Sequence, residues 1–324
     1  DKGIDLFINF SDGKSAGNQL QLAHSESAHN SKYYNEITGG ITNRTTAENS
    51  HPLIISGKSS AGLYLPNKNS VVTGQFAVDV QTPGGTADGS AGIYAVDDVD
   101  LQGHYIKLSG SNNVGVYPAP YNGTSNDADI YLGAGSIRLE GGNNNTGIVV
   151  KDNYGNVYSE SEMVLKGGNN NVAIYASKHN SGSSAAVDYD VMVKSIETDT
   201  DAMEDGVFVY TESGAKVKTD AAAGGLKIKG KISNGNPVYD GGTLSKNSGG
   251  VYAKSGSEVD ISQSGSTFGH GTGEYNIDIT GARAKDKAGN DTDVYAGFGL
   301  FADNATIKAN QNIVKATNTA VAAA

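Results

Sequence analysis

Apolar and polar residues alternate along most of the chain in runs of three to five residues. The run Phe76-Ala77-Val78-Asp79-Val80 is one example, and residues 99–101 and 277–279 follow the same pattern. Alternation with a period of two residues indicates a β-strand with one buried face. No segment keeps the i, i+3, i+4, i+7 apolar spacing of an amphipathic helix over about eleven residues. The sequence therefore predicts an all-β protein built from short strands.

A short pattern recurs along the chain: a small or polar residue, a Gly or Ala, a β-branched residue or Leu, and then usually an aromatic residue. Its first copy is Ala61-Gly62-Leu63-Tyr64. We call the Gly or Ala of each copy the marker. The markers are Gly62, Gly92, Gly115, Gly147, Ala173, Gly206, Gly250, Gly299 and Ala320. Self-similarity at spacings of 21 to 49 residues indicates a repeat architecture.

The residues before several markers are also repeated. Residues 141–147 (Gly-Gly-Asn-Asn-Asn-Thr-Gly) align with residues 167–173 (Gly-Gly-Asn-Asn-Asn-Val-Ala), and residues 110–115 form a shorter copy. Gly and Asn tolerate positive φ, so we expect a strand to end at the first Gly, a corner to follow, and a second strand to begin at the marker. Asn residues at equivalent corners are expected to stack into side-chain amide ladders.

Short strands, short repeats and the lack of a helical pattern together predict a parallel β-helix (a solenoid) with loop insertions between coils. Marker spacings of 30 to 33 residues indicate one coil with an insertion, whereas the spacings of 44 and 49 residues each indicate two coils, with degenerate markers at Gly225 and Gly273 respectively. We therefore expect about ten coils between residues 62 and 320. Residues 52–324 form the repeat-bearing region, and residues 1–51 are expected to form less regular coils with loops.

Composition narrows the range of functions. The formal charge is 24 − 35 = −11, which argues against nucleic acid and anionic membranes as partners, because phosphates require clustered Lys and Arg. The absence of Cys excludes a disulfide scaffold, a thiolate zinc site and a Cys nucleophile, and it suits a chain exported through an oxidising compartment. Neither end carries a targeting signal or a clear stop, so we expect a piece of a longer chain.

The repeats resemble those of a known family. Residues 167–176 (Gly-Gly-Asn-Asn-Asn-Val-Ala-Ile-Tyr-Ala) and 247–253 (Asn-Ser-Gly-Gly-Val-Tyr-Ala) are similar to repeats of autotransporter (type V secretion) passenger domains, in particular of large fusobacterial-type outer-membrane adhesins. The resemblance covers most of residues 52–324, and residues 1–51 fit it less well. It implies a right-handed parallel β-helix that is displayed outside a Gram-negative cell. A signal peptide and a C-terminal translocator, which would link such a passenger to the membrane, are not part of this sequence.

Residues that could carry chemistry are scattered. The six histidines (His24, His29, His51, His104, His179 and His270) lack the spacing of metal ligands, and we expect them to be polar surface residues. Three groups of acids could serve catalysis, as the paired carboxylates of polysaccharide-cleaving enzymes do, or bind a cation, or form solvated loops. They are Asp97, Asp98 and Asp100; Asp188 and Asp190; and Glu197, Asp199, Asp201, Glu204 and Asp205. The solvated loops are favoured, and we predict no catalytic residue, metal site or cofactor.

Lys227, Lys229 and Lys231 alternate with apolar residues, so their ammonium groups are expected to share one outward face. Such a face could contact an anion or a sialic acid, or it could discourage lateral aggregation of the sheet. The second interpretation is favoured.

Tyrosines follow five of the markers, and we expect them to form an aromatic ladder on the outside of the coils. They are Tyr64, Tyr94, Tyr117, Tyr175 and Tyr252. The ladder could contact a protein or a sugar, or it could simply stabilise the stack through ring–ring contacts. Specific recognition is also expected in the insertions at residues 118–129, 177–190, 197–205 and 233–248, where Tyr121 and Tyr189 are candidate anchors.

These observations favour a non-enzymatic segment of an extracellular adhesin on the bacterial cell surface. Its partners would be a host cell-surface protein or glycan, or the surface of another bacterium, with no nucleic acid and no direct membrane contact. The alternatives are a secreted polysaccharide lyase or hydrolase and a phage tail-spike-like protein. Carboxylates or basic groups gathered in one groove across adjacent coils would favour the enzyme.

Overall fold

The computed structural model describes residues 22–25, 34–37, 53–56, 59–65, 70–81, 89–120, 128–152, 154–178, 189–199, 203–220, 225–231, 249–263, 275–285 and 290–323. Over these residues the chain forms β-strands and no helix, as the alternating pattern predicts. The strands are β1 (Leu22–Ser25), β2 (Tyr34–Ile37), β3 (Leu53–Ile55), β4 (Ala61–Leu65), β5 (Ser70–Val80), β6 (Ala91–Ala95), β7 (Val99–Leu108), β8 (Val114–Pro118), β9 (Ala128–Glu140), β10 (Thr146–Lys151), β11 (Gly155–Lys166), β12 (Val172–Ser177), β13 (Val191–Thr198), β14 (Met203–Glu204), β15 (Val207–Glu212), β16 (Lys216–Thr219), β17 (Gly225–Lys231), β18 (Gly249–Lys254), β19 (Glu258–Asp260), β20 (Ile277–Thr280), β21 (Ala282–Lys285), β22 (Asp291–Ala296), β23 (Phe298–Asp303), β24 (Thr306–Lys308), β25 (Val314–Thr317) and β26 (Val321–Ala323).

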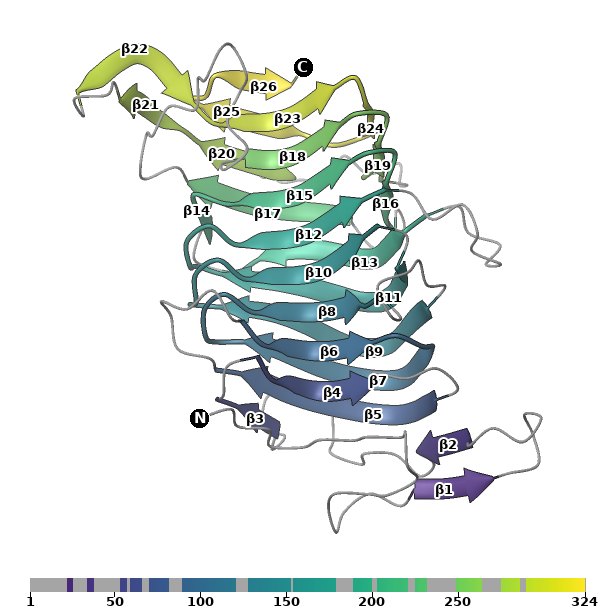
Figure 1. Cartoon of the computed structure of the whole chain (residues 1–324). Coiled ribbons are helices and arrows are strands. Elements are labelled where there is room, and N and C mark those ends of the chain that lie inside the picture. Colours follow the sequence, from purple (N-terminus) through teal and green to yellow (C-terminus); the bar gives the residue numbers. More distant parts are fainter. Residues whose placement is uncertain are drawn as a thin grey trace.

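Most strands belong to two parallel sheets that lie one behind the other (Figure 1). The nine-stranded sheet has the order β26-β23-β18-β15-β12-β10-β8-β6-β4, so its strands stack in the order of the sequence. The fifteen-stranded sheet follows the order β1-β2-β5-β7-β9-β11-β13-β16-β19-β24, with β3, β14, β17, β20 and β25 paired beside this path. Between β4 and β13 the chain alternates between the sheets, and we call one such pass a repeat. Parallel strands stacked in order agree with a solenoid type of architecture.

Two strand pairs depart from the parallel arrangement. β1 pairs with β2 in antiparallel fashion, and β21 and β22 form a separate antiparallel pair. In Figure 1 the β1–β2 pair lies at the N-terminal end of the stack and the β21–β22 pair at the C-terminal end. The repeats between them are parallel layers.

The strand register corrects the expected number of coils. β15 pairs directly with β18, and β18 pairs directly with β23, so each of the two long marker intervals adds one strand to the nine-stranded sheet, not two. Gly225 is not an intermediate marker, because it begins β17 in the other sheet, and Gly273 lies outside the described residues. The nine markers therefore fall in nine consecutive strands of this sheet or directly beside them, and the excess length of the two intervals is insertion.

The register also moves two markers by two residues. Val172 pairs with Val207, and Val207 with Gly249, so Phe208 and not Gly206 occupies the marker position of β15. Phe298 pairs with Val321, which places Ala322 and not Ala320 at this position in β26. The sequence pattern was misleading at both places because a small residue happens to stand two positions before the structural marker.

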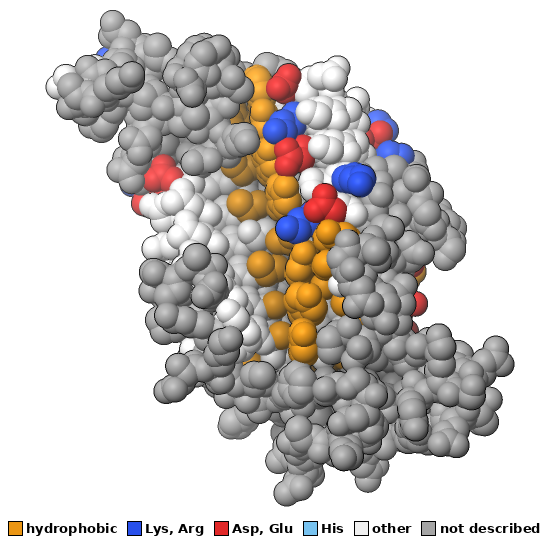
Figure 2. Space-filling model, viewed as in Figure 1, with side chains coloured by type: hydrophobic (Ala, Val, Ile, Leu, Met, Phe, Trp, Pro, Cys, Tyr) orange, Lys and Arg blue, Asp and Glu red, His pale blue; other side chains and the backbone are white. Residues whose placement is uncertain are grey.

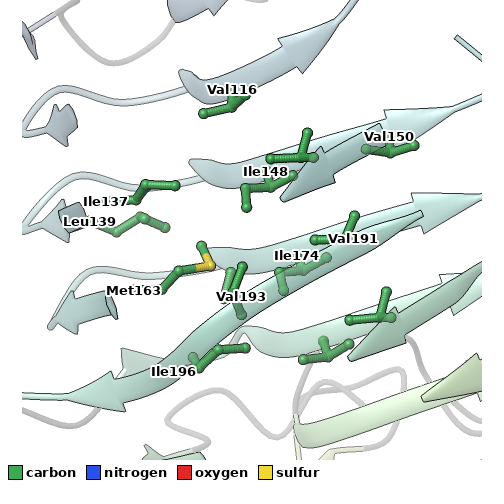
Figure 3. Close-up of a cluster of buried hydrophobic side chains, with 14 of the residues drawn as sticks. Val116, Ile137, Leu139, Ile148, Val150, Met163, Ile174, Val191, Val193 and Ile196 are labelled. Atoms are coloured by element: carbon green, nitrogen blue, oxygen red, sulfur yellow. The ribbon is translucent and has the colours of Figure 1, made fainter. Parts of the chain in front are cut away.

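The core lies between the two sheets and consists of columns of like side chains (Figure 3). Val116, Ile148 and Ile174 stack in successive strands of the nine-stranded sheet and are fully buried. Ile137, Met163 and Ile196 form the facing column from the other sheet. Each layer therefore buries its apolar residues against the layers above and below, as in other repeat proteins.

The marker glycines are required by close packing between repeats. A Cβ atom at Gly92 would lie 2.6 Å from the carbonyl oxygen of Gly115 and 2.7 Å from a methyl group of Ile106. A Cβ atom at Gly147 would lie 2.4 Å from the terminal carbon of Met163. Real Cβ atoms do not approach other atoms this closely, so a side chain at these markers would displace the core.

The corners use positive φ and asparagine, as the sequence predicts. Asn112, Asn144 and Asn170 have φ values of 61°, 57° and 57°. One rung of the expected amide ladder is present, since the side-chain amide of Asn144 donates to the side-chain oxygen of Asn112 at 3.2 Å. The buried amides of Asn113, Asn145 and Asn171 bond to backbone instead. The oxygen Oδ1 of each accepts the backbone N–H of the preceding repeat: from Ser90 to Asn113 at 3.0 Å, from Asn113 to Asn145 at 2.9 Å and from Asn145 to Asn171 at 2.8 Å. These bonds satisfy buried backbone donors at every corner of this part of the stack.

Candidate functional site

The candidate site is a column of aromatic side chains on the outer face of the nine-stranded sheet. Tyr64 pairs with Tyr94 and Tyr94 with Tyr117, so three of the expected tyrosines stand in adjacent repeats. Val149 takes the next place, and the column resumes with Tyr175. The full column is Tyr64, Tyr94, Tyr117, Val149, Tyr175, Tyr210, Tyr252 and Phe301. We call the first three residues the lower segment and the four after Val149 the upper segment.

Tyr210 and Phe301 are members that the sequence analysis missed. Both follow the structural marker by two residues, as Tyr64 and Tyr94 do. The shifted marker at Gly206 hid Tyr210, because Phe208 then seemed to be the aromatic residue of that copy. Strict alternation would put Phe208 and Tyr210 on the same face. In the structure Phe208 and Val209 both lie in the core and Tyr210 lies outside, so the sequence pattern could not tell the two aromatic residues apart.

The rings of the two segments pack differently. In the lower segment, ring centroids are 5.2 Å apart between Tyr64 and Tyr94 and 5.6 Å apart between Tyr94 and Tyr117, with interplanar angles of 44° and 72°. In the upper segment, Tyr175, Tyr210 and Tyr252 are stacked at 5.4 and 5.3 Å with angles of 7° and 28°. The upper rings are nearly parallel, whereas the lower rings are tilted against one another.

A groove of about 640 Å³ runs beside the lower segment. Its floor consists of Ala61, Ala91 and Val114, which stand in register three residues before the tyrosines. One wall is the tyrosine column and the other is the row of corner residues, which includes Ser59, Gly89 and Asn112. None of the described residues that line the groove carries a charge. Figure 2 shows the apolar stripe (orange) that follows this face along the stack.

The same position in the upper segment holds Val172, Val207, Gly249 and Phe298, and the ring of Phe298 covers Gly249. Val207 and Phe298 take the places of the floor alanines, and only 2% and 1% of their surface is exposed. They form a second hydrophobic cluster with Tyr210 and Tyr252, separate from the core between the sheets. A smaller hollow of about 310 Å³ is left between Thr146, Val172, Tyr175, Val207, Tyr210 and Glu212.

Charged residues border the upper segment. Glu212 accepts hydrogen bonds from the hydroxyl of Tyr175 at 2.7 Å and from that of Tyr210 at 3.0 Å, and it forms an ion pair with Lys254 at 2.8 Å. Burial alone would raise the pKa of Glu212, but the hydrogen bonds from Lys254, Tyr175 and Tyr210 outweigh it and lower this pKa. The hydrogen bond to Glu212 in turn raises the pKa of Lys254 well above its ordinary value.

The tyrosines stay protonated at neutral pH. Burial raises the pKa of Tyr117 and that of Tyr210 to about 12. Burial and, to a smaller extent, the neighbouring Tyr64 raise the pKa of Tyr94. The phenols are therefore neutral hydroxyls that can donate and accept hydrogen bonds.

Of the two tyrosines predicted in insertions, Tyr189 is not part of the column. Tyr189 is half-buried, and the ammonium group of Lys218 lies 5.1 Å from the centre of its ring. Tyr121 lies outside the described residues, as do most of the four predicted recognition insertions.

The acidic groups are dispersed over the stack. The backbone N–H of Asp129 donates to Asp98 at 2.9 Å, and the backbone N–H of Lys216 donates to the fully buried Asp190 at 2.7 Å. Asp199 and Glu204 pair with Lys166 and Lys231 at 3.7 and 3.6 Å. Asp188 and Asp201 lie outside the described residues. Within the described part of the chain, no three His, Asp or Glu residues come together in the manner of a metal site.

Lys227, Lys229 and Lys231 share an exposed face, as predicted, while Leu226 and Ile228 between them are buried. A hollow of about 280 Å³ lies next to this face. Its lining mixes Lys227, Lys229 and Lys315 with the carboxylates of Asp199 and Asp278, and Lys315 pairs with Asp278 at 3.3 Å. The lysine charges are thus partly neutralised by acids of neighbouring strands.

A cluster of charged residues that the sequence analysis missed lies on the fifteen-stranded sheet. Glu140 pairs with Lys107 at 3.1 Å and with Arg138 at 2.6 Å, and Lys107 also lies 3.9 Å from Asp79. These residues come from β5, β7 and β9, which are adjacent strands. Burial alone would raise the pKa of Glu140, but the hydrogen bonds from Arg138 and Lys107 lower it. Only the strand register reveals this cluster, because its members are about thirty residues apart in the sequence.

His104 corrects the expectation that the histidines are surface residues. Its side chain is fully buried, and neither ring nitrogen has a hydrogen-bond partner among the described residues. It stands in β7 at the bend of the sheet, paired with Phe76 on one side and Gly135 on the other. Burial lowers its pKa to about 4. The side chains of the other five histidines lie outside the described residues.

Comparisons of the chain with models of protein families, with curated proteins and with solved structures found no match. In the described part of the chain, no helix has the length and the apolar character needed to cross a membrane.

Proposed function

We propose that this chain is a non-enzymatic segment of a bacterial surface adhesin of the autotransporter passenger type. In this proposal the stacked repeats wind as a right-handed parallel β-helix, and the chain is displayed outside the cell, where it attaches to host cells or to other bacteria. The parallel, in-order sheets and the Asn/Gly corners support the architecture.

One observation carries the proposal: a row of aromatic side chains, interrupted by Val149, on one face of a regular stack, with an open, uncharged groove beside its lower segment. Tyrosine combines a large apolar surface with a hydroxyl group, and it is enriched where proteins make contact with partners. Such rows on a rigid scaffold suit repeated surface contact. The partner would be a protein or a glycan of the host cell surface, or the surface of another bacterium.

A second candidate, cleavage of polysaccharides, is favoured by the cluster of Asp79, Lys107, Arg138 and Glu140 across three adjacent strands. The protonation behaviour of Glu140 in this cluster does not suit the role. A glycosidase needs one carboxylic acid with a raised pKa as proton donor, whereas the pKa of Glu140 is lowered by its two basic neighbours. Release of reducing ends from acidic or neutral glycans at several pH values, abolished by Glu140→Gln, would make the enzyme the better proposal.

The adhesin proposal is tested by coating beads with the full chain and counting those that bind to epithelial cells or to bacteria of other species. The matched control is a chain in which residues 179–188 and 233–248 of the insertions are scrambled while all strands and the buried Asp190 are kept. We expect the native chain to attach well above uncoated beads. Attachment no better than that of uncoated beads would reduce the segment to a spacer and overturn the proposal.

A further inference from the structure

We propose that the groove beside Tyr64, Tyr94 and Tyr117 binds an extended, uncharged, proline-rich peptide segment in the polyproline II conformation. This inference rests on the proposed function, because it names the chemistry of a partner that the adhesin would hold. It assigns the contact to the lower segment alone and excludes the upper segment.

The shape of the groove fits a single extended chain. The groove spans three repeats and has a floor of small side chains, Ala61, Ala91 and Val114, between the tyrosine column and the row of corners. A polyproline II segment is narrow and has its conformation largely fixed before binding, so it loses little conformational entropy in such a groove. Aromatic-lined grooves of this kind are a recurrent way of binding proline-rich segments.

The hydrogen-bonding groups are complementary. A proline-rich segment has carbonyl acceptors without internal partners and lacks backbone donors. The groove supplies donors: among the described residues, the hydroxyls of Tyr94 and Tyr117 have no hydrogen-bond partner. The amide of Asn112 uses its oxygen to accept a bond from Asn144 at 3.2 Å, which leaves its nitrogen as a further donor.

Electrostatics and ring packing narrow the ligand class. No described residue that lines the groove is charged, so a neutral ligand is favoured over an acidic or basic one. Neighbouring rings of the lower segment lie 5.2 and 5.6 Å apart and are tilted by 44° and 72°, so the column forms a ridged surface and not one flat aromatic face. A sugar packs best on an open, flat ring face, whereas prolines insert between the ridges of such a surface. The peptide is therefore the better fit.

The test measures binding of a capped, fluorescently labelled decaproline peptide to the full chain by fluorescence anisotropy. A capped Gly/Ser decapeptide and an uncharged linear hexasaccharide are the comparison ligands. Decaproline is expected to bind, with an affinity that does not change between low and high salt because no charges are involved. The two comparison ligands are expected not to compete.

Three groove variants locate the binding. Tyr94→Ala removes the central ring and is expected to weaken binding by about tenfold or more. Ala91→Leu fills the floor, leaves all three rings in place and is expected to have a similar effect. Tyr94→Phe removes only a hydroxyl and is expected to weaken binding by about fivefold. The matched control is Tyr131→Ala, which removes a 42% exposed tyrosine of the other sheet and should bind as the native chain does.

Each outcome decides the proposal. Binding of decaproline that is lost in Tyr94→Ala and Ala91→Leu supports it, and Ala91→Leu and Tyr94→Phe keep it testable if Tyr94→Ala does not fold. Absence of decaproline binding, equal binding of the Gly/Ser peptide, displacement by the hexasaccharide, or insensitivity to Ala91→Leu would each overturn it. If the coated beads still attach to cells in any of those cases, the adhesin proposal stands and only the peptide ligand is wrong.

Discussion

The lower and upper segments of the aromatic column occupy equivalent places in the same sheet, yet one borders a groove and the other is packed. The residues three positions before the aromatic rings contribute to this difference. They are Ala61, Ala91 and Val114 in the lower segment, and Val172, Val207, Gly249 and Phe298 in the upper segment. The ring of Phe298 also covers Gly249, so Phe298 and Val207 close the upper face and bury the rings, whereas the lower residues leave the groove open. One repeated backbone position can therefore provide either a contact surface or a second core.

The two segments also differ in the charged residues that border them. The described lining of the lower groove is uncharged, while the upper segment holds Glu212 between two tyrosine hydroxyls and Lys254. Figure 2 shows charged side chains beside the upper part of the apolar stripe. The upper rings are thus fixed by stacking and by hydrogen bonds, and we expect them to contribute to stability more than to binding.

Replacing Phe298, which fills the groove position in β23, is expected to have the largest effect on the free energy of unfolding. Phe298→Ala removes a ring with 1% of its surface exposed, which packs 5.8 Å from Tyr252 and 6.2 Å from Phe301 between ring centroids. Truncation of a fully buried aromatic residue costs about 4 kcal/mol. Urea denaturation of the variant and the native chain measures the loss. The half-exposed Phe301 provides the control, since Phe301→Ala should cost about 1 kcal/mol. If both variants lost the same unfolding free energy, the buried ring of Phe298 would not be what stabilises the upper segment.

Acid should weaken the stack around β7, through His104. Its pKa is about 4 in the fold and 6.5 as the ordinary value. Between these values the unfolded chain binds a proton that the folded chain does not, so stability falls as the pH decreases from about 6.5 to about 4. The difference in pKa corresponds to a loss of about 3 kcal/mol over this window.

The pH effect has a matched variant within the chain. Phe76 occupies the position of His104 in the preceding repeat, so His104→Phe places there a residue that the stack already accepts. Thermal unfolding between pH 4 and pH 7 should lose most of its pH dependence in this variant. If the pH dependence of thermal unfolding were unchanged in this variant, other groups and not His104 would cause the loss of stability in acid.

Much of the fold could be predicted from the sequence because repetition is visible in it. The alternation of Val99, Asp100 and Leu101 follows from the need for one buried face, and the glycines at markers such as Gly92 and Gly147 follow from the lack of room for a Cβ atom. The Asn corners were predictable for the same reason, since positive φ favours Asn and Gly. Handedness is not encoded in any of these local patterns.

The rest depended on register, which local patterns do not determine. In β15 both Phe208 and Tyr210 could have continued the column, and only the pairing of Val207 with Val172 and Gly249 places Tyr210 there. The burial of His104 was hidden because it stands at a bend, where two successive residues face the core and alternation fails. Insertions of unknown length in the two long intervals also prevented a correct count of the coils.

Truncating equivalent rings of the two segments should separate stability from binding. Tyr210 is 8% exposed and bonded to Glu212, so Tyr210→Ala is expected to cost about 3 kcal/mol in urea denaturation. Tyr94 is half-buried beside the groove, and Tyr94→Ala should cost about 1 kcal/mol. The difference of about 2 kcal/mol is the expected result. Losses of the same size would contradict the division of the column into a packed and an open segment.

The smallest effect is expected from the charge of the upper segment. Glu212→Gln keeps the shape of the side chain but removes the ion pair with Lys254, and such partly exposed pairs contribute about 0.5 kcal/mol. The pKa of Glu212 is lower in the fold than its ordinary value, so its stabilisation is present at neutral pH and is lost as the pH falls through the folded pKa. Native chain and variant should therefore differ at pH 7, converge in acid and converge in high salt. Glu160→Gln, at an exposed position of β11, should change nothing. A difference that persists in acid would mean that Glu212 acts through its hydrogen bonds to Tyr175 and Tyr210 and not through its charge.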